Sequence, residues 1–143
     1  MSDEPFDTRD AVVVVLVRDE RVLVIRRASK VIFPGYWTPP SGRVRVGEMQ
    51  EATVVREVRE EVGLQATPIR SVWECETEDG QFHLHWWLAQ AGPGDWSLDD
   101  VEVSDARWIR PIEFAELTPT FADDRWFFEQ ILPEHMPRRS RGG

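Results

Sequence analysis

The stretch from residue 42 to residue 64 constrains the chain most, because a glycine is followed by a helix-forming segment rich in glutamate and by a closing glycine. Residues 56–62 have helical periodicity, and Gly63 stands just past their end, where a left-handed cap needs no Cβ. Three glutamates spaced three and four positions apart share one helical face: Glu57, Glu60 and Glu61. Like charges at this spacing cost roughly 0.2–0.5 kcal/mol per pair. Hard cations such as Mg2+ prefer several oxygen ligands, and three glutamates on one face would supply them.

A solvated helix with pairs such as Arg56–Glu60 would also explain this glutamate run taken alone. The full spacing is much harder to meet by chance: Gly42-x5-Glu48-x7-Arg56-Glu57-Val58-Arg59-Glu60-Glu61-Val62-Gly63-Leu64. It resembles the Nudix box, Gly-x5-Glu-x7-Arg-Glu-(aliphatic)-x-Glu-Glu-x-Gly-(aliphatic), at every fixed position. The resemblance implies a loop–helix–loop that holds divalent metal against the diphosphate of a nucleoside diphosphate derivative. It does not identify the substrate.

The resemblance also implies roles for the residues of the box. The metal, Mg2+ with Mn2+ able to substitute, is expected mainly on Glu57 and Glu61, with Glu60 contributing. Which carboxylate acts as general base stays open. Arg56 and Glu48 are expected to form a structural pair that ties the loop to the helix, and Glu48 also to touch metal through water. Gly42 is expected to lie in the substrate-binding loop.

Length and charge agree with one small enzyme domain. A chain of 143 residues buries about two thirds of its unfolded surface. We expect a disordered N-terminus over 1–10, a Nudix domain over 11–132 and a flexible tail over 133–143. Cys75 is the only cysteine, which favours a reducing cytoplasm. The net charge of −9 argues against nonspecific binding to nucleic acid or a membrane surface. The expected partner is a small nucleotide, and the expected assembly is a monomer or a homodimer.

Alternating apolar runs and turn residues predict a mixed sheet between helices. Strands are expected at 11–17, 21–27, 67–78, 81–90 and 106–110, with Asp79-Gly80 as a hairpin turn. The box helix, a short helix over 111–117 and a closing helix over 122–132 complete the pattern. Residues 28–41 and 91–104 are expected to be loops. The predicted fold class is an α/β/α sandwich of the Nudix type, with the box loop–helix–loop and a C-terminal helix.

Outside the box, one acidic and several basic residues are candidates for the site. Glu102 lies in an acidic loop, and Nudix chains resembling MutT carry a metal-binding glutamate at about that place. A solvated surface loop is the alternative. Arg27 matches an arginine that touches nucleotide phosphates in MutT-like members, although it could simply end a strand. Arg43 and Arg45, beside the box glycine, would add positive charge in the same region.

Two tryptophans and two histidines are further candidates for the site. Trp37, in the loop before the box, and Trp87, in a strand, are candidates for stacking on a base. His83 and His85 share a strand face with Trp87, and a pair at this spacing could bind zinc. Because neither a cysteine nor the third histidine is expected nearby, lining of a substrate pocket or ordinary sheet packing is favoured.

The segment from residue 120 to residue 128 bears on the substrate. It resembles the Trp-Pro-Asp-Asp stretch of Nudix enzymes that hydrolyse oxidised purine nucleoside triphosphates, but has Phe121 and Ala122 in place of tryptophan and proline. The resemblance implies that Asp123 and Asp124 contact a purine edge and that Phe121 stacks on the ring. The alternative is structural, because acidic residues at a helix start cap free N–H groups and complement the dipole.

The sequence therefore predicts a Mg2+-dependent Nudix hydrolase that cleaves a phosphoanhydride. A nucleoside triphosphate pyrophosphohydrolase, with oxidised purine deoxynucleotides among its candidate substrates, leads, giving a nucleoside monophosphate and pyrophosphate. An ADP-ribose, nucleotide-sugar or dinucleoside polyphosphate hydrolase is the enzyme alternative. A non-catalytic Nudix-fold sensor is the alternative from another class, and the complete set of glutamates argues against it.

Overall fold

Strand β1 (Asp10–Arg18) lies at the centre of a mixed sheet in the computed structural model, which describes residues 9–136. Its interior residues are all buried, as the valine-rich run predicts for a strand covered on both faces. Along one edge, β1 pairs in parallel with β6 (His83–Ala91). Along the other edge it pairs antiparallel with β2 (Arg21–Arg27) near one end and with β4 (Ser41–Arg43) near the other.

The remaining strands extend the sheet on both sides. β2 also pairs with β3 (Trp37–Thr38) and with β7 (Val103–Ile109), and β5 (Ala66–Glu76) pairs with β6. The predicted hairpin is confirmed, although both of its strands stop short of the turn. The strands β3 and β4 lie in or beside a segment predicted to be loop. They are two and three residues long and flank two prolines, so they carry no alternating pattern.

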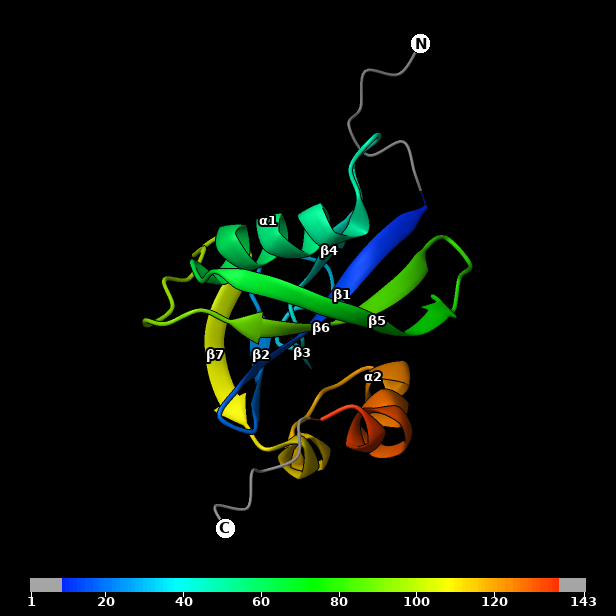
Figure 1. The fold of residues 1–143 in the computed structure, drawn as a ribbon. Helices are drawn as coiled ribbons and strands as arrows, with labels where there is room; N and C mark the ends of the chain where they lie inside the picture. Colours follow the sequence, from blue (N-terminus) through cyan, green and yellow to red (C-terminus); the bar gives the residue numbers. More distant parts are fainter. Residues whose placement is uncertain (1–8, 137–143) are drawn as a thin grey trace.

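Helical layers cover the two faces of this sheet (Figure 1). Helix α1 (Gln50–Val62) packs Val54, Val58 and Val62 against one face of β1. The opposite face is covered by a 3-10 helix (Pro111–Glu116) and by α2 (Ala122–Trp126), which continues as a π-helical stretch (Phe127–Ile131) and a 3-10 turn (Leu132–Glu134). The predicted α/β/α sandwich with a C-terminal helix is confirmed.

Some predicted boundaries need correction. Helix α1 begins at Gln50, before the predicted start at Arg56, and Gly63 ends it with φ 68°, as expected for a left-handed cap. Of the predicted disordered N-terminus, residues 1–8 lie outside the described residues, and Asp10 already belongs to β1. Of the predicted tail, residues 137–143 lie outside them. Between residues 9 and 136, no helix has the length and apolar character needed to cross a bilayer.

Candidate active site

Helix α1 turns two of its three glutamates inward. Glu57 and Glu61 are buried, with exposed fractions of 8% and 6%, whereas the side chain of Glu60 is 50% exposed. Residues four apart project in nearly the same direction, but Glu60 lies about 100° around the helix from Glu61. Of the three glutamates predicted to share one face, only Glu57 and Glu61 are therefore buried together, and Glu60 lies at the edge of this pair.

The glycine of β4 makes room for the first carboxyl group. A Cβ at Gly42 would lie 2.0 Å from Cδ of Glu57 and 2.3 Å from its Oε1. The backbone here cannot move away freely, because Gly42 pairs with Val12 of the central strand. Gly42 thus sets the position of Glu57, and its expected contact with substrate stays a prediction.

The second carboxyl group is held by the main chain. The N–H of Ser41 donates to Oε1 of Glu61 at 3.0 Å. The N–H of Asp99 donates to the carbonyl oxygen of Glu61, also at 3.0 Å, and attaches the 92–102 loop to the end of α1. Sequence reasoning missed Ser41 and Asp99 here, because a backbone donor gives no side-chain signal.

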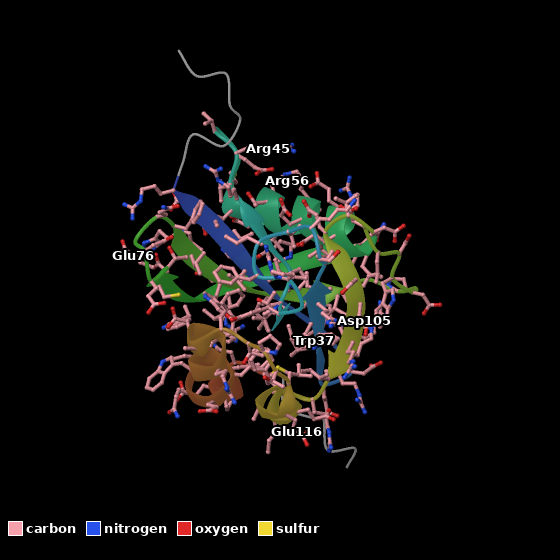
Figure 2. The ribbon with its side chains drawn as sticks, turned by 180° about the vertical axis from the view of Figure 1, so that it is seen from behind. Trp37, Arg45, Arg56, Glu76, Asp105 and Glu116 are labelled. Carbon is pink, nitrogen blue, oxygen red and sulfur yellow. The ribbon has the colours of Figure 1, made fainter. Side chains whose placement is uncertain are left out.

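Arg56 and Glu48 form the expected pair between loop and helix (Figure 2 labels Arg56 on α1). The Arg56 guanidinium donates to both oxygens of Glu48, from Nε at 2.8 Å and from Nη2 at 2.9 Å. This pairing lowers the pKa of Glu48 to about 2 and raises that of Arg56. The same guanidinium donates to the Arg43 carbonyl at 2.9 Å and to Oε1 of Glu57 at 2.6 Å. Arg56 therefore joins the loop, β4 and the first buried carboxyl group.

Burial makes the inward pair electrostatically costly. Loss of hydration raises the pKa of Glu57 to about 7, against the opposing effect of Arg56. Loss of hydration, followed by repulsion from Glu57, raises the pKa of Glu61 well above its usual range. The charge of Glu102 adds to both shifts. A group whose charged form is disfavoured in this way is stabilised by a nearby cation.

A divalent cation fits this set of donors. Glu57 and Glu61 are buried one turn apart on α1, the side chain of Glu60 is half exposed beside them, and the charge of Glu102 raises both pKa values. These are oxygen ligands of the kind that Mg2+ and Mn2+ prefer. A bound dication would also relieve the repulsion within the buried pair. Glu102 is exposed, on the loop that leads into β7.

Arg27 belongs to the same group of charges. Its pKa is lowered by burial, and the charges of Glu61 and Glu102 act on it in the opposite direction. Its Nε donates to the carbonyl of Ile32 at 2.6 Å. A pocket of about 430 Å³ opens beside it, lined by Arg26, Arg27, Ala28, Ser29, Pro34, Gly35, Asp100 and Ser104. The structure thus brings Arg27 together with the glutamates, as a phosphate-binding role requires.

The paired aspartates of α2 have different environments. Asp123 is exposed, whereas Asp124 is buried and accepts a hydrogen bond from Thr38 Oγ1 at 2.8 Å. Burial raises the pKa of Asp124 to about 7. The N-cap residue of α2 is Phe121, which makes no side-chain capping bond, and both aspartates lie in the first turn of the helix. Neither aspartate holds the N-cap position, but their place in the first turn agrees with the dipole part of the structural alternative.

Trp37 and Trp87, the two tryptophans predicted to stack on a base, do not lie on a common surface. Trp37 is buried in the core beneath the C-terminal helices, with the Arg107 guanidinium 4.5 Å from its ring centre. Trp87 packs on the opposite face of the sheet and donates to Oε1 of Gln50 at 2.8 Å. Stacking of either on a base stays a prediction, but the structure does not bring the two together.

Phe121 lies in a separate aromatic cluster that sequence reasoning missed. Its ring centre is 5.1 Å from that of Phe33 and 4.7 Å from that of Tyr36. Phe33 is 47% exposed, although large apolar residues are usually buried. Two of its members, Phe33 and Tyr36, lie in the loop between Arg27 and Trp37. A solvent-facing aromatic cluster of this kind could supply a stacking surface.

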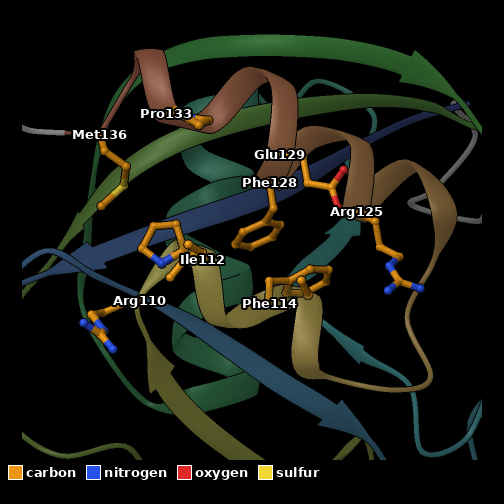
Figure 3. A pocket seen from close by; sticks show the side chains of 10 residues that line it. Arg110, Ile112, Phe114, Arg125, Phe128, Glu129, Pro133 and Met136 are labelled. Atoms are coloured by element: carbon orange, nitrogen blue, oxygen red, sulfur yellow. The ribbon is translucent and has the colours of Figure 1, made fainter.

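A larger hollow of about 510 Å³ lies away from the glutamates (Figure 3). It is formed by the 3-10 helix and the C-terminal helices, on the face of the sheet opposite α1. The stacked rings of Phe114 and Phe128, 4.0 Å apart, point into it. Since none of the carboxylates described above lines this pocket, it has no part in the candidate active site.

Comparisons with known proteins agree with the site. The sequence model described as NUDIX domain matches residues 7–131. The chain is 34% identical over 106 residues to a CTP pyrophosphohydrolase of Escherichia coli (strain K12), a match covering 73% of this chain and 77% of that protein. It is 30% identical over 95 residues to the putative mutator protein MutT4 of Mycobacterium tuberculosis, covering 62% of this chain. The chain spans only 38% of the length of that relative.

Among solved structures, the MutT protein from Methanosarcina mazei Go1 has the same fold. Its TM-score is 0.76 at 22% sequence identity, and the match covers 94% of this chain and 99% of that one. The family model extends over nearly the whole sheet and both helical layers. The chain therefore belongs to the Nudix hydrolase family.

Proposed function

We propose that this protein hydrolyses a phosphoanhydride bond of a nucleoside diphosphate derivative, using Mg2+ or, in its place, Mn2+. The observation that carries the proposal is the buried pair Glu57–Glu61, positioned by Gly42 and Ser41 and destabilised as charges by burial. A binding module without catalysis would have no use for two carboxylates buried at this cost. The leading substrate class is a nucleoside triphosphate cleaved to a nucleoside monophosphate and pyrophosphate.

Each residue of the site has a distinct part in the proposed reaction. Glu57 and Glu61 would hold the cation, with Glu60 and Glu102 at its edge. When bound, the cation offsets phosphate charge and acidifies the attacking water. Arg56 orients the Glu57 carboxyl group, and Arg27 offers a positive charge to the phosphates. Glu57, Glu60 and Glu61 are the candidates for general base.

A panel of nucleotides incubated with Mg2+ tests the reaction, with released pyrophosphate and released monophosphate measured separately. We expect pyrophosphate from triphosphates and little turnover of ADP-ribose, nucleotide sugars or dinucleoside polyphosphates. Glu57→Gln or Glu61→Gln should reduce turnover by orders of magnitude while the melting temperature stays level or rises, because repulsion is removed. Glu51→Gln, an exposed change in the first turn of α1, is the matched control. Near wild-type turnover of both site variants would disprove the assignment.

We propose further that the substrate carries a purine, with oxidised purine deoxynucleotides as the first to be tested. The exposed carboxylate of Asp123 and the cluster around Phe121 support this, since a carboxylate accepts hydrogen bonds from a guanine-type edge. Because the E. coli relative is named for CTP, pyrimidine triphosphates form the comparison arm.

Asp123→Ala should raise KM for purine triphosphates and reduce discrimination against pyrimidines. Loss of one charge-assisted hydrogen bond corresponds to roughly 1.5–3 kcal/mol, about tenfold or more in kcat/KM. Asp95→Ala, at an exposed loop position, is the control. A variant with an unchanged substrate profile would remove the base-contact role from Asp123.

The proposal also covers the compartment in which the protein works and its oligomeric state. The single cysteine supports a reducing cytoplasm. The partner is the nucleotide itself, and sedimentation equilibrium would distinguish a monomer from a homodimer.

A further inference from the structure

Two histidines and a glutamate meet on the β5–β6 hairpin, outside the candidate active site. One ligand atom from each of Glu74, His83 and His85 lies within 4.8 Å of the other two. Oε1 of Glu74 is 2.7 Å from Nε2 of His83 and 3.4 Å from Nδ1 of His85. The sheet register explains the meeting, because Glu74 pairs directly with His85. The third ligand is a carboxylate from the neighbouring strand, which a search for cysteine or a third histidine overlooks.

The outer nitrogen of each histidine faces a further carboxylate. Nε2 of His85 is 2.9 Å from Oδ1 of Asp10, and Nδ1 of His83 is 3.9 Å from Oε1 of Glu76. Histidines that bind metal usually donate their second N–H to a carboxylate, which fixes the ring and its tautomer. The arrangement therefore leaves Nδ1 of His85 and Nε2 of His83 directed toward the shared oxygen of Glu74.

We propose that Glu74, His83 and His85 form a second cation site, built for a transition-metal dication such as Zn2+. Ligand atoms around tetrahedral zinc, with bonds of about 2.0–2.1 Å, lie about 3.4 Å apart. The contacts of 2.7 and 3.4 Å need only a small movement of Glu74, whose side chain is 58% exposed. Two imidazole ligands favour zinc, nickel or copper over Mg2+, which prefers oxygen.

This site is separate from the hydrolytic one. Glu74, His85, Val12 and Gly42 follow one another across the strands β5, β6, β1 and β4. With neighbouring strands about 4.8 Å apart, the backbone of His85 is about 10 Å from that of Gly42. Figure 2 labels Glu76 at the end of β5, where the hairpin turns. An ion here would link β5, which pairs with β6 alone among the strands of residues 9–136, to β6 and, through Asp10, to β1.

Calorimetric titration of Zn2+ into the full chain, with Mg2+ in excess to occupy the glutamates of α1, tests the site. We expect one bound ion, a rise in melting temperature, and with Co2+ the visible absorption of a tetrahedral nitrogen–oxygen site. Asp10→Asn should weaken binding about 10–100-fold, as loss of an outer partner does. His83→Gln with His85→Gln should weaken it further. Mg2+-dependent hydrolysis should be unchanged in all of these variants.

Two matched controls separate this site from general surface binding. His135→Gln removes the histidine outside the cluster, and Glu78→Gln removes an exposed glutamate near the turn, as the counterpart of Glu74→Gln. Both controls should bind Zn2+ as the wild type does. Equal Zn2+ binding by the double histidine variant and the wild type would overturn the proposal, as would equal binding by Glu74→Gln. Absence of Zn2+ binding in the wild type would show that the cluster is only a cross-strand ion pair.

Discussion

At the level of single residues, the position of Glu57 depends on two neighbours of opposite kind. Arg56 donates a hydrogen bond to its carboxyl group, and Gly42 leaves the space that the carboxyl group fills. Gly42 is not among the residues with positive φ, so the reason for glycine here is close approach and not backbone conformation. A larger residue at position 42 would therefore displace the side chain of Glu57.

Gly42→Ala should lower kcat by about 100-fold or more, because misplacing a reacting group by about 1 Å costs this much. Stability should also fall, by about 1–3 kcal/mol, because the added methyl group meets Cγ of the buried Glu57 side chain as well as its carboxyl group. Steady-state kinetics and thermal unfolding would measure the two effects separately. Gly92→Ala is the control, because this glycine also lacks a positive φ and its Cβ would meet Gln65 at 3.1 Å, away from the glutamates. An unchanged kcat in Gly42→Ala would contradict the positioning role.

At the level of elements, one guanidinium connects three of them. Arg56 on α1 reaches Glu48 in the preceding loop and the Arg43 carbonyl of β4. Thr53 Oγ1 and the Arg45 N–H also donate to Glu48, at 2.7 and 3.1 Å. With 14% and 15% of their side chains exposed, Arg56 and Glu48 are shielded more than a typical surface pair.

Arg56→Ala should lower stability by about 2 kcal/mol, because Glu48 and the Arg43 carbonyl each lose a charged donor. Turnover should fall too, since Glu57 loses its orienting hydrogen bond. The stability and turnover of Arg56→Lys should lie between those of the wild type and those of Arg56→Ala, because an ammonium cannot bind both oxygens of Glu48 in the same way. Chemical denaturation and kinetics measure both effects. Arg59→Ala, on the exposed side of the same helix, is the control. If the Arg56→Ala variant melted and turned over like the wild type, Arg56 would be an ordinary surface residue.

The box could be predicted from the sequence because its signals are local. Glycine as helix cap, the i, i+4 glutamates and the Arg56–Glu48 pair all lie within one continuous segment. The features that could not be predicted depend on contacts between segments that are distant in the sequence. The hydrogen bond from Thr38 to Asp124 joins residues 86 apart, and that from Ser41 to Glu61 uses a backbone donor. The start of α1 was misplaced because its N-cap residue is Met49, whose side chain makes no capping bond. Residues 50–55 carry no other signal that a helix begins.

At the level of the whole molecule, the second helical layer is held to the sheet partly through a buried polar contact. Thr38 of β3 donates to Asp124 of α2, beside a core that includes Phe127 and Leu132. Burial raises the pKa of Asp124 to about 7, whereas an unfolded aspartate titrates near about 3.9. Between these values the folded protein binds a proton that the unfolded chain does not. Stability from this group therefore falls as pH rises through that window.

Asp124→Asn should abolish this dependence, because the amide stays neutral and its oxygen still accepts from Thr38. The variant should match the wild type near about pH 4 and melt at a higher temperature above about pH 7. Thermal unfolding across this range, without divalent cations, measures the difference. Asp123→Asn, at the exposed neighbouring position, should show no such trend. A difference between Asp124→Asn and the wild type that is the same at every pH would contradict the buried, neutral carboxyl group.

Because β1 pairs in parallel with β6, the central strand stays without this neighbour until about half of the chain that follows it has been synthesised. Pairings between distant segments form slowly, since a long loop must close before any contact rewards it. During that time one edge of the valine-rich run of 11–17 is unpaired, and such segments are prone to associate with other chains. The glutamates of α1 are close in sequence, yet Glu57 reaches its place only after β4 has docked on β1. During synthesis on the ribosome, the hydrolytic site would therefore be completed only when the sheet forms, after helix α1 has formed.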